Sequence, residues 1–178
     1  MKLIILDRDG VINQDSSDYI KSPEEWIPIP GSLQAIANLN QSGCRVVIAS
    51  NQSGLARGLF DIDTLNAIHR KMQNELWNIG GYVDGIFFCP HGPNDRCSCR
   101  KPKPGLLSQA SHRFFSDTNG ILSIGDSLRD LEAADNFGIK PILVLTGNGK
   151  KTSKEITHRK NIPIYKNLFD AVQDLLKS

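Results

Sequence analysis

Short apolar runs alternate with amphipathic helical patterns along this chain, and that alternation restricts its possible folds more than any other feature. Buried strands are predicted at residues 2–6, 45–49, 85–88, 121–124 and 141–145. Helices are predicted at residues 32–43, 62–79, 106–115, 128–137 and 168–177, with Met72 and Trp77 of the second helix in the core. Strands that alternate with helices favour a parallel sheet covered on both faces. We therefore predict an α/β fold with a doubly wound, Rossmann-like sheet that binds its ligand at the carboxyl ends of the strands.

The length and charge of the chain limit the number of domains and the kinds of partner that can be expected. With 178 residues and no internal repeat or linker, residues 1–178 are predicted to form a single domain. No apolar run approaches the ~18 residues of a membrane span, and the apolar start is too short for a signal peptide, so we expect a cytoplasmic monomer without a membrane partner. The 21 basic and 19 acidic residues indicate no nucleic-acid partner. Five basic residues near the C-terminus are interpreted as solvated surface: Lys150, Lys151, Lys154, Arg159 and Lys160.

Two carboxylates follow the first predicted strand, in the motif Asp7-Arg8-Asp9-Gly10. At the end of a strand both can point into the crevice, where one acts as a nucleophile or metal ligand and the other as a general acid and base. A plain turn capped by an aspartate, or a calcium loop, uses the same short pattern. This motif alone therefore leaves those alternatives open.

Three more polar motifs follow later strands. Ser50 to Gly54 offers a hydroxyl and backbone N–H groups to an anion, although a simple turn has the same composition. Arg100 and Lys101 lie on a proline-rich arm and suit a phosphate group. Asp126 follows the fourth strand, where it is suited to a hard cation, and Asp130 is expected to orient the ligands of that cation from the first turn of the next helix.

The order of these four motifs resembles that of the haloacid dehalogenase-like phosphatase superfamily over nearly the whole chain. By that resemblance Asp7 is the nucleophile that takes the phosphoryl group, and Asp9 protonates the leaving oxygen and later activates water. Ser50 and Lys101 hold the phosphoryl oxygens. Asp7, the carbonyl of Asp9 and Asp126 bind Mg²⁺. The presence of Asp9 favours hydrolysis of a phosphate ester over dehalogenation, since an alkoxide leaving group needs a proton. A zinc-bearing binding module without turnover is the alternative, but the completeness of the motifs favours an enzyme.

A second cluster lies in the loop at residues 89–99. Three thiols and one imidazole are the ligand set of a closed, structural zinc site: Cys89, His91, Cys97 and Cys99. Disulfides or unrelated buried thiols are the alternatives, but a second disulfide would need Cys44 from another element. Zinc would fix the loop that carries Arg100 and Lys101, because Cys99 directly precedes Arg100.

The spacing of the motifs leaves no room for a cap domain. Only about twenty residues separate Val11 from the helix at Ser32, and the next gap holds a helix, a strand and the zinc loop. The motifs are similar to two zinc-bearing groups of the superfamily. One removes the C7 phosphate of a heptose 1,7-bisphosphate during synthesis of nucleotide-activated heptose for lipopolysaccharide. The other dephosphorylates histidinol phosphate in histidine biosynthesis. The sequence following Ser50 and Lys101 favours the first group, although Ser127 stands where some of its members have a lysine.

The same resemblance implies a set of substrate contacts. These are expected at Asp15, Ser16, Ser17, Asp18, Asn51, Gln52, Ser53 and Arg100. A cationic rim of Arg57, Arg100, Lys101 and Lys103 favours a bisphosphate, whereas Asp15 and Asp18 are suited to the amine of histidinol phosphate. An exposed polar turn is the alternative interpretation of the loop at 15–19. Structural roles are expected for His69, His112 and His158.

Overall fold

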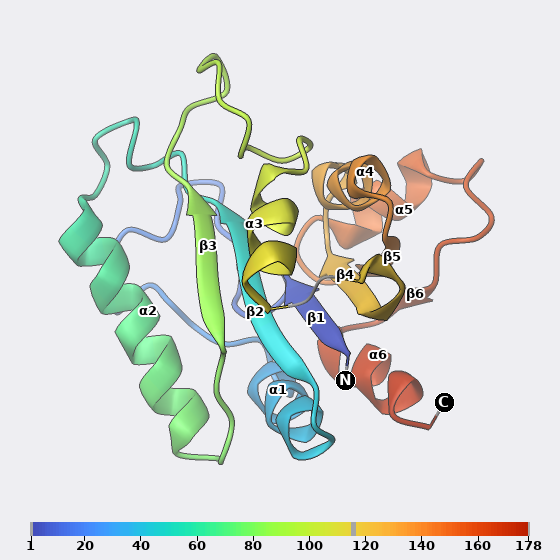
Figure 1. Cartoon of the computed structure of the whole chain (residues 1–178). Coiled ribbons are helices and arrows are strands. Elements are labelled where there is room, and N and C mark those ends of the chain that lie inside the picture. Colours follow the sequence, from blue (N-terminus) through green and yellow to red (C-terminus); the bar gives the residue numbers. More distant parts are fainter. Residues whose placement is uncertain (1, 115–116, 178) are drawn as a thin grey trace.

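A six-stranded, fully parallel sheet forms the centre of the molecule (Figure 1). The computed structural model describes residues 2–114 and 117–177. Its strands are β1 Leu3–Leu6, β2 Arg45–Asn51, β3 Gly85–Cys89, β4 Ile121–Gly125, β5 Lys140–Val144 and β6 Ile164–Tyr165. Their order is β3-β2-β1-β4-β5-β6, so the chain winds outward from β1 first in one direction and then in the other. This is the doubly wound arrangement that the alternating pattern predicted.

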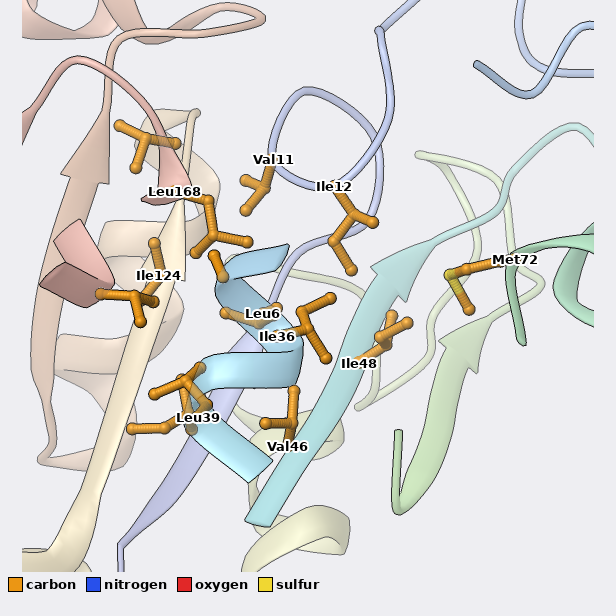
Figure 2. Close-up of a cluster of buried hydrophobic side chains, with 14 of the residues drawn as sticks. Leu6, Val11, Ile12, Ile36, Leu39, Val46, Ile48, Met72, Ile124 and Leu168 are labelled. Carbon is orange, nitrogen blue, oxygen red and sulfur yellow. The ribbon is translucent and has the colours of Figure 1, made fainter. Parts of the chain in front are cut away.

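Helices cover both faces of the sheet because alternate strand residues point to opposite faces. The helices are α1 Ser32–Gln41, α2 Ile62–Trp77, α3 Gly105–Phe114, α4 Leu128–Phe137, α5 Gly149–Glu155 and α6 Leu168–Leu175. Ile4 and Leu6 of β1 pack in a cluster with α1, α2 and α6, part of which is shown in Figure 2. Leu3 and Ile5 pack in a second cluster with α3 and α4. Each face of the central strand is thus buried under a separate helical layer.

The segment between β1 and α1 is packed into the body of the protein instead of forming a cap. Val11, Ile12, Ile20 and Trp26 are buried in the first apolar cluster. The Nζ atom of Lys71 on α2 donates hydrogen bonds to the carbonyls of Pro23 and Trp26, at 2.9 and 2.8 Å. The prediction that this chain has no cap domain is confirmed, and the carboxyl edge of the sheet stays open.

Three features differ from the sequence-based expectations. The short α5 and β6 were not predicted, because α5 is rich in lysine without an apolar stripe and β6 has only two residues. Trp77 was predicted in the core but is 63% exposed, since it follows the buried Leu76 by one helical position and so faces about 100° away from it. Met72 is buried as predicted. The helix predicted at 106–115 is observed from Gly105 to Phe114, and its last predicted residue, 115, lies outside the described part of the chain.

Over the described residues, no helix combines the length and the apolar character that crossing a membrane requires.

Candidate active site

The carboxyl ends of three neighbouring strands bring the four motifs together. Leu6 of β1 lies in register with Ile48 of β2 and with Ile124 of β4. Asp7, Ser50 and Asp126 therefore emerge at the same edge of the sheet. They line a cavity of about 330 Å³ to which the arm after the zinc loop adds Arg100 and Lys101. The structure thus places the proposed nucleophile, anion-binding groups and metal ligands around one space.

Lys101 is buried beside Asp7 and is held by several groups. Its Nζ lies 2.9 Å from Asp7 Oδ1 and 2.6 Å from Asp130 Oδ1, and it donates to the carbonyl of Ala49 at 2.7 Å. Burial alone would lower the pKa of Lys101, but the charges of Asp130 and Asp7 outweigh it and raise the pKa. The backbone of Lys101 is bound in both directions by the amide of Asn51, at 3.0 and 3.1 Å. Lys101 is therefore a fixed positive charge in the cavity, directly beside Asp7.

Asp130 positions this lysine, and one of its carboxylate oxygens also lies within 4.8 Å of carboxylate oxygens of Asp7 and Asp126, the candidate metal ligands. Its Oδ2 accepts hydrogen bonds from the backbone N–H and the hydroxyl of Ser127, at 3.0 and 2.5 Å. Ser127 is the N-cap residue of α4, so the same contacts cap this helix. The charge of Lys101 and these hydrogen bonds outweigh the effect of burial and lower the pKa of Asp130. The carboxylate is consequently ionised and directed at the lysine.

Replacing Asp130 should impair turnover through Lys101. In Asp130→Asn the ammonium keeps only Asp7 as a charged partner and binds it more tightly, so we expect kcat to fall at least about tenfold. The matched control is Asp135→Asn on the same helix, which breaks an exposed pair with Arg159. Steady-state kinetics of both variants check the prediction, and equal kcat values would contradict it.

Asp7 and Asp126 form a site suited to a divalent cation. Asp7, Asp126 and Asp130 each offer a carboxylate oxygen within 4.8 Å of one another. Burial and neighbouring carboxylates raise the pKa of Asp7 to about 7, against the opposing charge of Lys101, and that of Asp126 to about 8. A bound cation would relieve this repulsion, and oxygen ligands are those that Mg²⁺ prefers. Both carboxylate oxygens of Asp130 are already engaged, Oδ1 by Lys101 and Oδ2 by Ser127, whereas Asp7 contacts Lys101 through Oδ1 alone. Asp7 and Asp126 are therefore the better donors for a cation.

Backbone packing fixes the carboxylate of Asp126. Its Oδ2 accepts a hydrogen bond of 2.7 Å from the backbone N–H of Asn148, and its own carbonyl accepts one of 2.8 Å from the hydroxyl of Thr152. Gly10 and Gly147, with φ of +85° and +54°, lie so close that a Cβ on either would stand 2.2 Å from Asp126 Oδ2. The unpredicted helix α5, which contains Thr152, thus supports the metal site.

Asp9 is held by a network of donors. The guanidinium of Arg8 binds both of its oxygens at 2.9–3.0 Å, Asn13 Nδ2 donates to Oδ1 at 2.9 Å, and Gln52 Nε2 donates to Oδ2 at 3.0 Å. Burial would raise the pKa of Asp9, but the charge of Arg8 and these hydrogen bonds outweigh it and lower the pKa. Gln52 Nε2 also donates to Ser50 Oγ at 2.8 Å, which leaves the hydroxyl proton of Ser50 free to be donated.

The predicted zinc ligands converge in the loop between β3 and α3, beyond the carboxyl ends of the strands (Figure 1). Cys89 Sγ lies 3.8 Å from Cys97 Sγ and 3.5 Å from His91 Nδ1, and Cys99 Sγ lies 3.1 Å from Cys89 Sγ and 3.3 Å from His91 Nδ1. Tetrahedral zinc separates two sulfurs by about 3.8 Å and a sulfur from a nitrogen by about 3.5 Å. The separations of Cys89 from Cys97 and from His91 agree with zinc, and Cys99 lies nearer to Cys89 than a bound ion would leave it. The ligand set and its convergence fit zinc, and all three thiols of the cluster are free.

The zinc loop also carries the cationic arm. Arg100 lines the cavity, and its Nη1 donates a hydrogen bond of 3.2 Å to the carbonyl of His91. Lys103 was expected on the cavity rim, but its Nζ instead donates to the carbonyl of Cys97 within the loop, and the residue is exposed. The position of Arg100 in the cavity therefore depends on the conformation of the zinc loop.

The expected substrate contacts are only partly brought together. Six of them line the cavity: Asp15, Ser16, Asn51, Gln52, Ser53 and Arg100. Ser17 lines a neighbouring shallow hollow, and Asp18 is paired with Lys21 at 2.8 Å. Arg129 and Asn148 also line the cavity and were missed. Arg129 lies in the motif of Asp126, so its position gave a usable signal; Asn148 precedes the unpredicted α5 and gave none.

Two protein-family models match this chain. One, for HAD-hydrolase-like proteins, matches residues 98–171, and the other, for polynucleotide kinase 3 phosphatases, matches residues 2–128. With the parallel sheet and the motifs at its carboxyl edge, these matches show the class of protein. It is a haloacid dehalogenase-like phosphatase, as the order of the motifs indicated.

Individual relatives define the family more narrowly. The D-glycero-beta-D-manno-heptose-1,7-bisphosphate 7-phosphatase of Bordetella bronchiseptica is 62% identical over 152 residues, 85% of either protein. A crystal structure of D,D-heptose 1,7-bisphosphate phosphatase from B. bronchiseptica complexed with magnesium and phosphate has a TM-score of 0.96 at 55% identity and covers 99% of both chains. The D-glycero-alpha-D-manno-heptose-1,7-bisphosphate 7-phosphatase of Mycobacterium bovis is 40% identical over 136 residues, 75% of this chain and 71% of that protein. This chain belongs to the heptose-1,7-bisphosphate 7-phosphatase family.

Proposed function

We propose that this protein hydrolyses the C7 phosphate ester of D-glycero-β-D-manno-heptose 1,7-bisphosphate, in the synthesis of nucleotide-activated heptose for lipopolysaccharide. The observation that carries the proposal is the match, at 55% identity and a TM-score of 0.96 over 99% of both chains, to a heptose bisphosphate phosphatase that holds magnesium and phosphate. The β anomer is preferred in the proposal because the relative named for it is 62% identical, whereas the relative named for the α anomer is 40% identical.

In the first half-reaction Asp7 attacks the phosphorus of the C7 phosphate. The new bond joins a carboxylate oxygen of Asp7 to phosphorus, the bond between phosphorus and the sugar oxygen breaks, and Asp9 gives that oxygen a proton. Asp9 is ionised in the structure, but a phosphoryl group beside it adds negative charge that raises its pKa and favours the protonated form. Lys101 and the hydroxyl of Ser50 bind the phosphoryl oxygens as charge develops on them.

In the second half-reaction water attacks the phosphorus of the aspartyl phosphate. Asp9 takes a proton from this water, the bond between phosphorus and Asp7 breaks, and inorganic phosphate leaves with the carboxylate restored. Bound Mg²⁺, held by Asp7, Asp126 and the carbonyl of Asp9, would offset the repulsion between Asp7 and the phosphoryl oxygens. The protein thus supplies a nucleophile, a proton carrier and fixed positive charge.

The cavity is suited to a doubly phosphorylated substrate. Arg57, Arg100 and Arg129 all line it, in addition to the buried Lys101. Arg57 also lies over the ring of Tyr19, with its Cζ 5.9 Å from the ring centre, which joins the 15–19 loop to the loop after β2. We propose that these arginines bind the second phosphate. The predicted substrate contacts Asp15, Ser16 and Ser53 then bind the hydroxyl groups of the sugar.

The substrate assignment is tested by comparing two phosphate esters. We expect kcat/KM for the β-heptose 1,7-bisphosphate to exceed that for histidinol phosphate at least about a hundredfold, which corresponds to about 2.7 kcal/mol of transition-state discrimination. The α anomer, measured in the same assay, should be the poorer of the two bisphosphates. Equal values for the bisphosphate and histidinol phosphate, or a preference for the latter, would overturn the substrate while leaving the phosphatase chemistry intact.

The organisation of the protein is also part of the proposal. We propose that residues 1–178 act as a single catalytic domain and as a monomer, in the cytoplasm, where free thiols persist and can hold zinc. The single catalytic domain is supported by the fact that Asp7, Ser50, Lys101 and Asp126 all line one cavity.

A further inference from the structure

A buried contact between an arginine and a histidine lies behind the active site, and none of the steps above uses it. Arg8 is fully buried, and its Nη1 lies 3.2 Å from Nε2 of His69. His69 belongs to α2, is 8% exposed, and packs near the ring of Phe88 with a centroid separation of 6.3 Å. His69 does not line the cavity. The contact joins α2 to the loop that carries Asp7 and Asp9.

The chemistry of the two side chains fixes the direction of this hydrogen bond. A guanidinium has donors only, so Nε2 of His69 is the acceptor and the imidazole is neutral with its proton on Nδ1. Burial, followed by the charge of Arg8, lowers the pKa of His69 to about 4, which agrees with this form. His69 therefore supplies the acceptor that Nη1 of Arg8 needs in a buried place.

The opposite side of the same guanidinium holds Asp9. Nε donates to Asp9 Oδ1 at 3.0 Å, and Nη2 donates to the two carboxylate oxygens at 2.9 and 3.0 Å. Loss of the acceptor at Nη1 would leave a buried donor unsatisfied, which is energetically unfavourable. The guanidinium would relieve that cost by turning, and the carboxylate of Asp9 would move with it.

We propose that His69 is a positioning residue for proton transfer: it fixes the guanidinium of Arg8, which in turn fixes the carboxylate of Asp9. The inference rests on the proposed role of Asp9 as the proton carrier, and it deepens that function by adding a residue outside the cavity. The step that His69 influences is the protonation of the leaving oxygen. It does not contribute to the affinity for phosphate.

The test uses a pair of variants and a pair of substrates. His69→Leu fills the same space without an acceptor, whereas His69→Gln offers an amide oxygen to Arg8. His112→Leu, on the exposed side of α3, is the matched control. Each protein is assayed in single-turnover experiments with heptose 1,7-bisphosphate, whose alkoxide leaving group needs a proton, and with p-nitrophenyl phosphate, whose leaving group does not.

We expect His69→Leu to slow the single turnover of the sugar bisphosphate about tenfold with little change in the enzyme concentration that gives half the maximal rate, and to change the rate of p-nitrophenol release less than about twofold. His69→Gln should restore the rate on the bisphosphate to within about threefold of the parent protein. Equal slowing of both substrates, no slowing of either, or failure of His69→Gln to restore the rate would overturn the proposal.

A second readout does not depend on activity. Nitrogen NMR of the imidazole of His69 should show the neutral form with the proton on Nδ1, and the proton on Nε2 would overturn the inference. If the parent protein does not turn over the bisphosphate, the proposed function fails by itself. The leaving-group comparison is then made with another alkyl phosphate, so that the two failures remain distinguishable.

Discussion

Asp7→Asn is expected to reduce kcat at least about 10⁴-fold, because the amide cannot attack phosphorus and no other carboxylate stands in its place. The fold should be retained, since Lys101 keeps its ion pair with Asp130 at 2.6 Å and one of several repelling carboxylates is removed. Steady-state kinetics and thermal melting of the same preparation check both parts of this prediction.

The control for this change is Asp63→Asn, which makes the same replacement at an exposed position in the first turn of α2. Its kcat should stay within about twofold of the parent value. Turnover of Asp7→Asn within tenfold of the parent would remove Asp7 as the nucleophile. A large fall in its melting temperature would assign the residue a structural role instead.

Loss of the zinc site should have the second largest effect, and it should act first on stability. Cys97→Ser removes one of four ligands, and loss of a structural metal is among the few single changes that cost more than about 4 kcal/mol. At roughly 2–4 °C per kcal/mol for a chain of this length, the melting temperature should fall by at least about 8 °C. The KM for phosphate esters should rise as well, because Arg100 is bound to the carbonyl of His91.

Metal content and a second cysteine separate this effect from general damage. About one zinc per chain should copurify with the parent protein and be lost from Cys97→Ser, and added Mg²⁺ should not restore stability. Cys44→Ser, at a half-buried cysteine outside the cluster, should keep both the zinc and the melting temperature. A parent protein purified without chelator that contains no zinc would refute the site.

The sequence predicts most of the fold because each long element carries its own periodic signal. The boundaries of α4 agree residue for residue, and the strands shift by only one or two positions. Short elements lack such a signal: β6 has two residues, and α5 is held by Thr152 against the carbonyl of Asp126 and not by an apolar stripe. Their formation depends on tertiary contacts that spacing along the chain does not reveal.

The candidate site, like the fold, contains features that the sequence predicts and features that it does not. Asp7, Ser50 and Asp126 were predictable, because the ends of parallel strands necessarily meet at one edge. The pairing of Lys101 with Asp130 was not predictable, since it depends on how the arm after the zinc loop folds back over α4. His69 was expected to be structural, and only the three-dimensional arrangement shows its contact with Arg8.

The most direct test of the central claim is to identify the residue that carries the phosphoryl group during turnover. In Asp9→Asn the second half-reaction lacks its base, so an intermediate formed from p-nitrophenyl phosphate, which needs no acid, should accumulate. Acid quenching, reduction of the acyl phosphate with borohydride and mass spectrometry of the N-terminal peptide then locate the group. The proposed mechanism predicts modification of Asp7, and modification at Ser50 or any other residue, or at none, would contradict it.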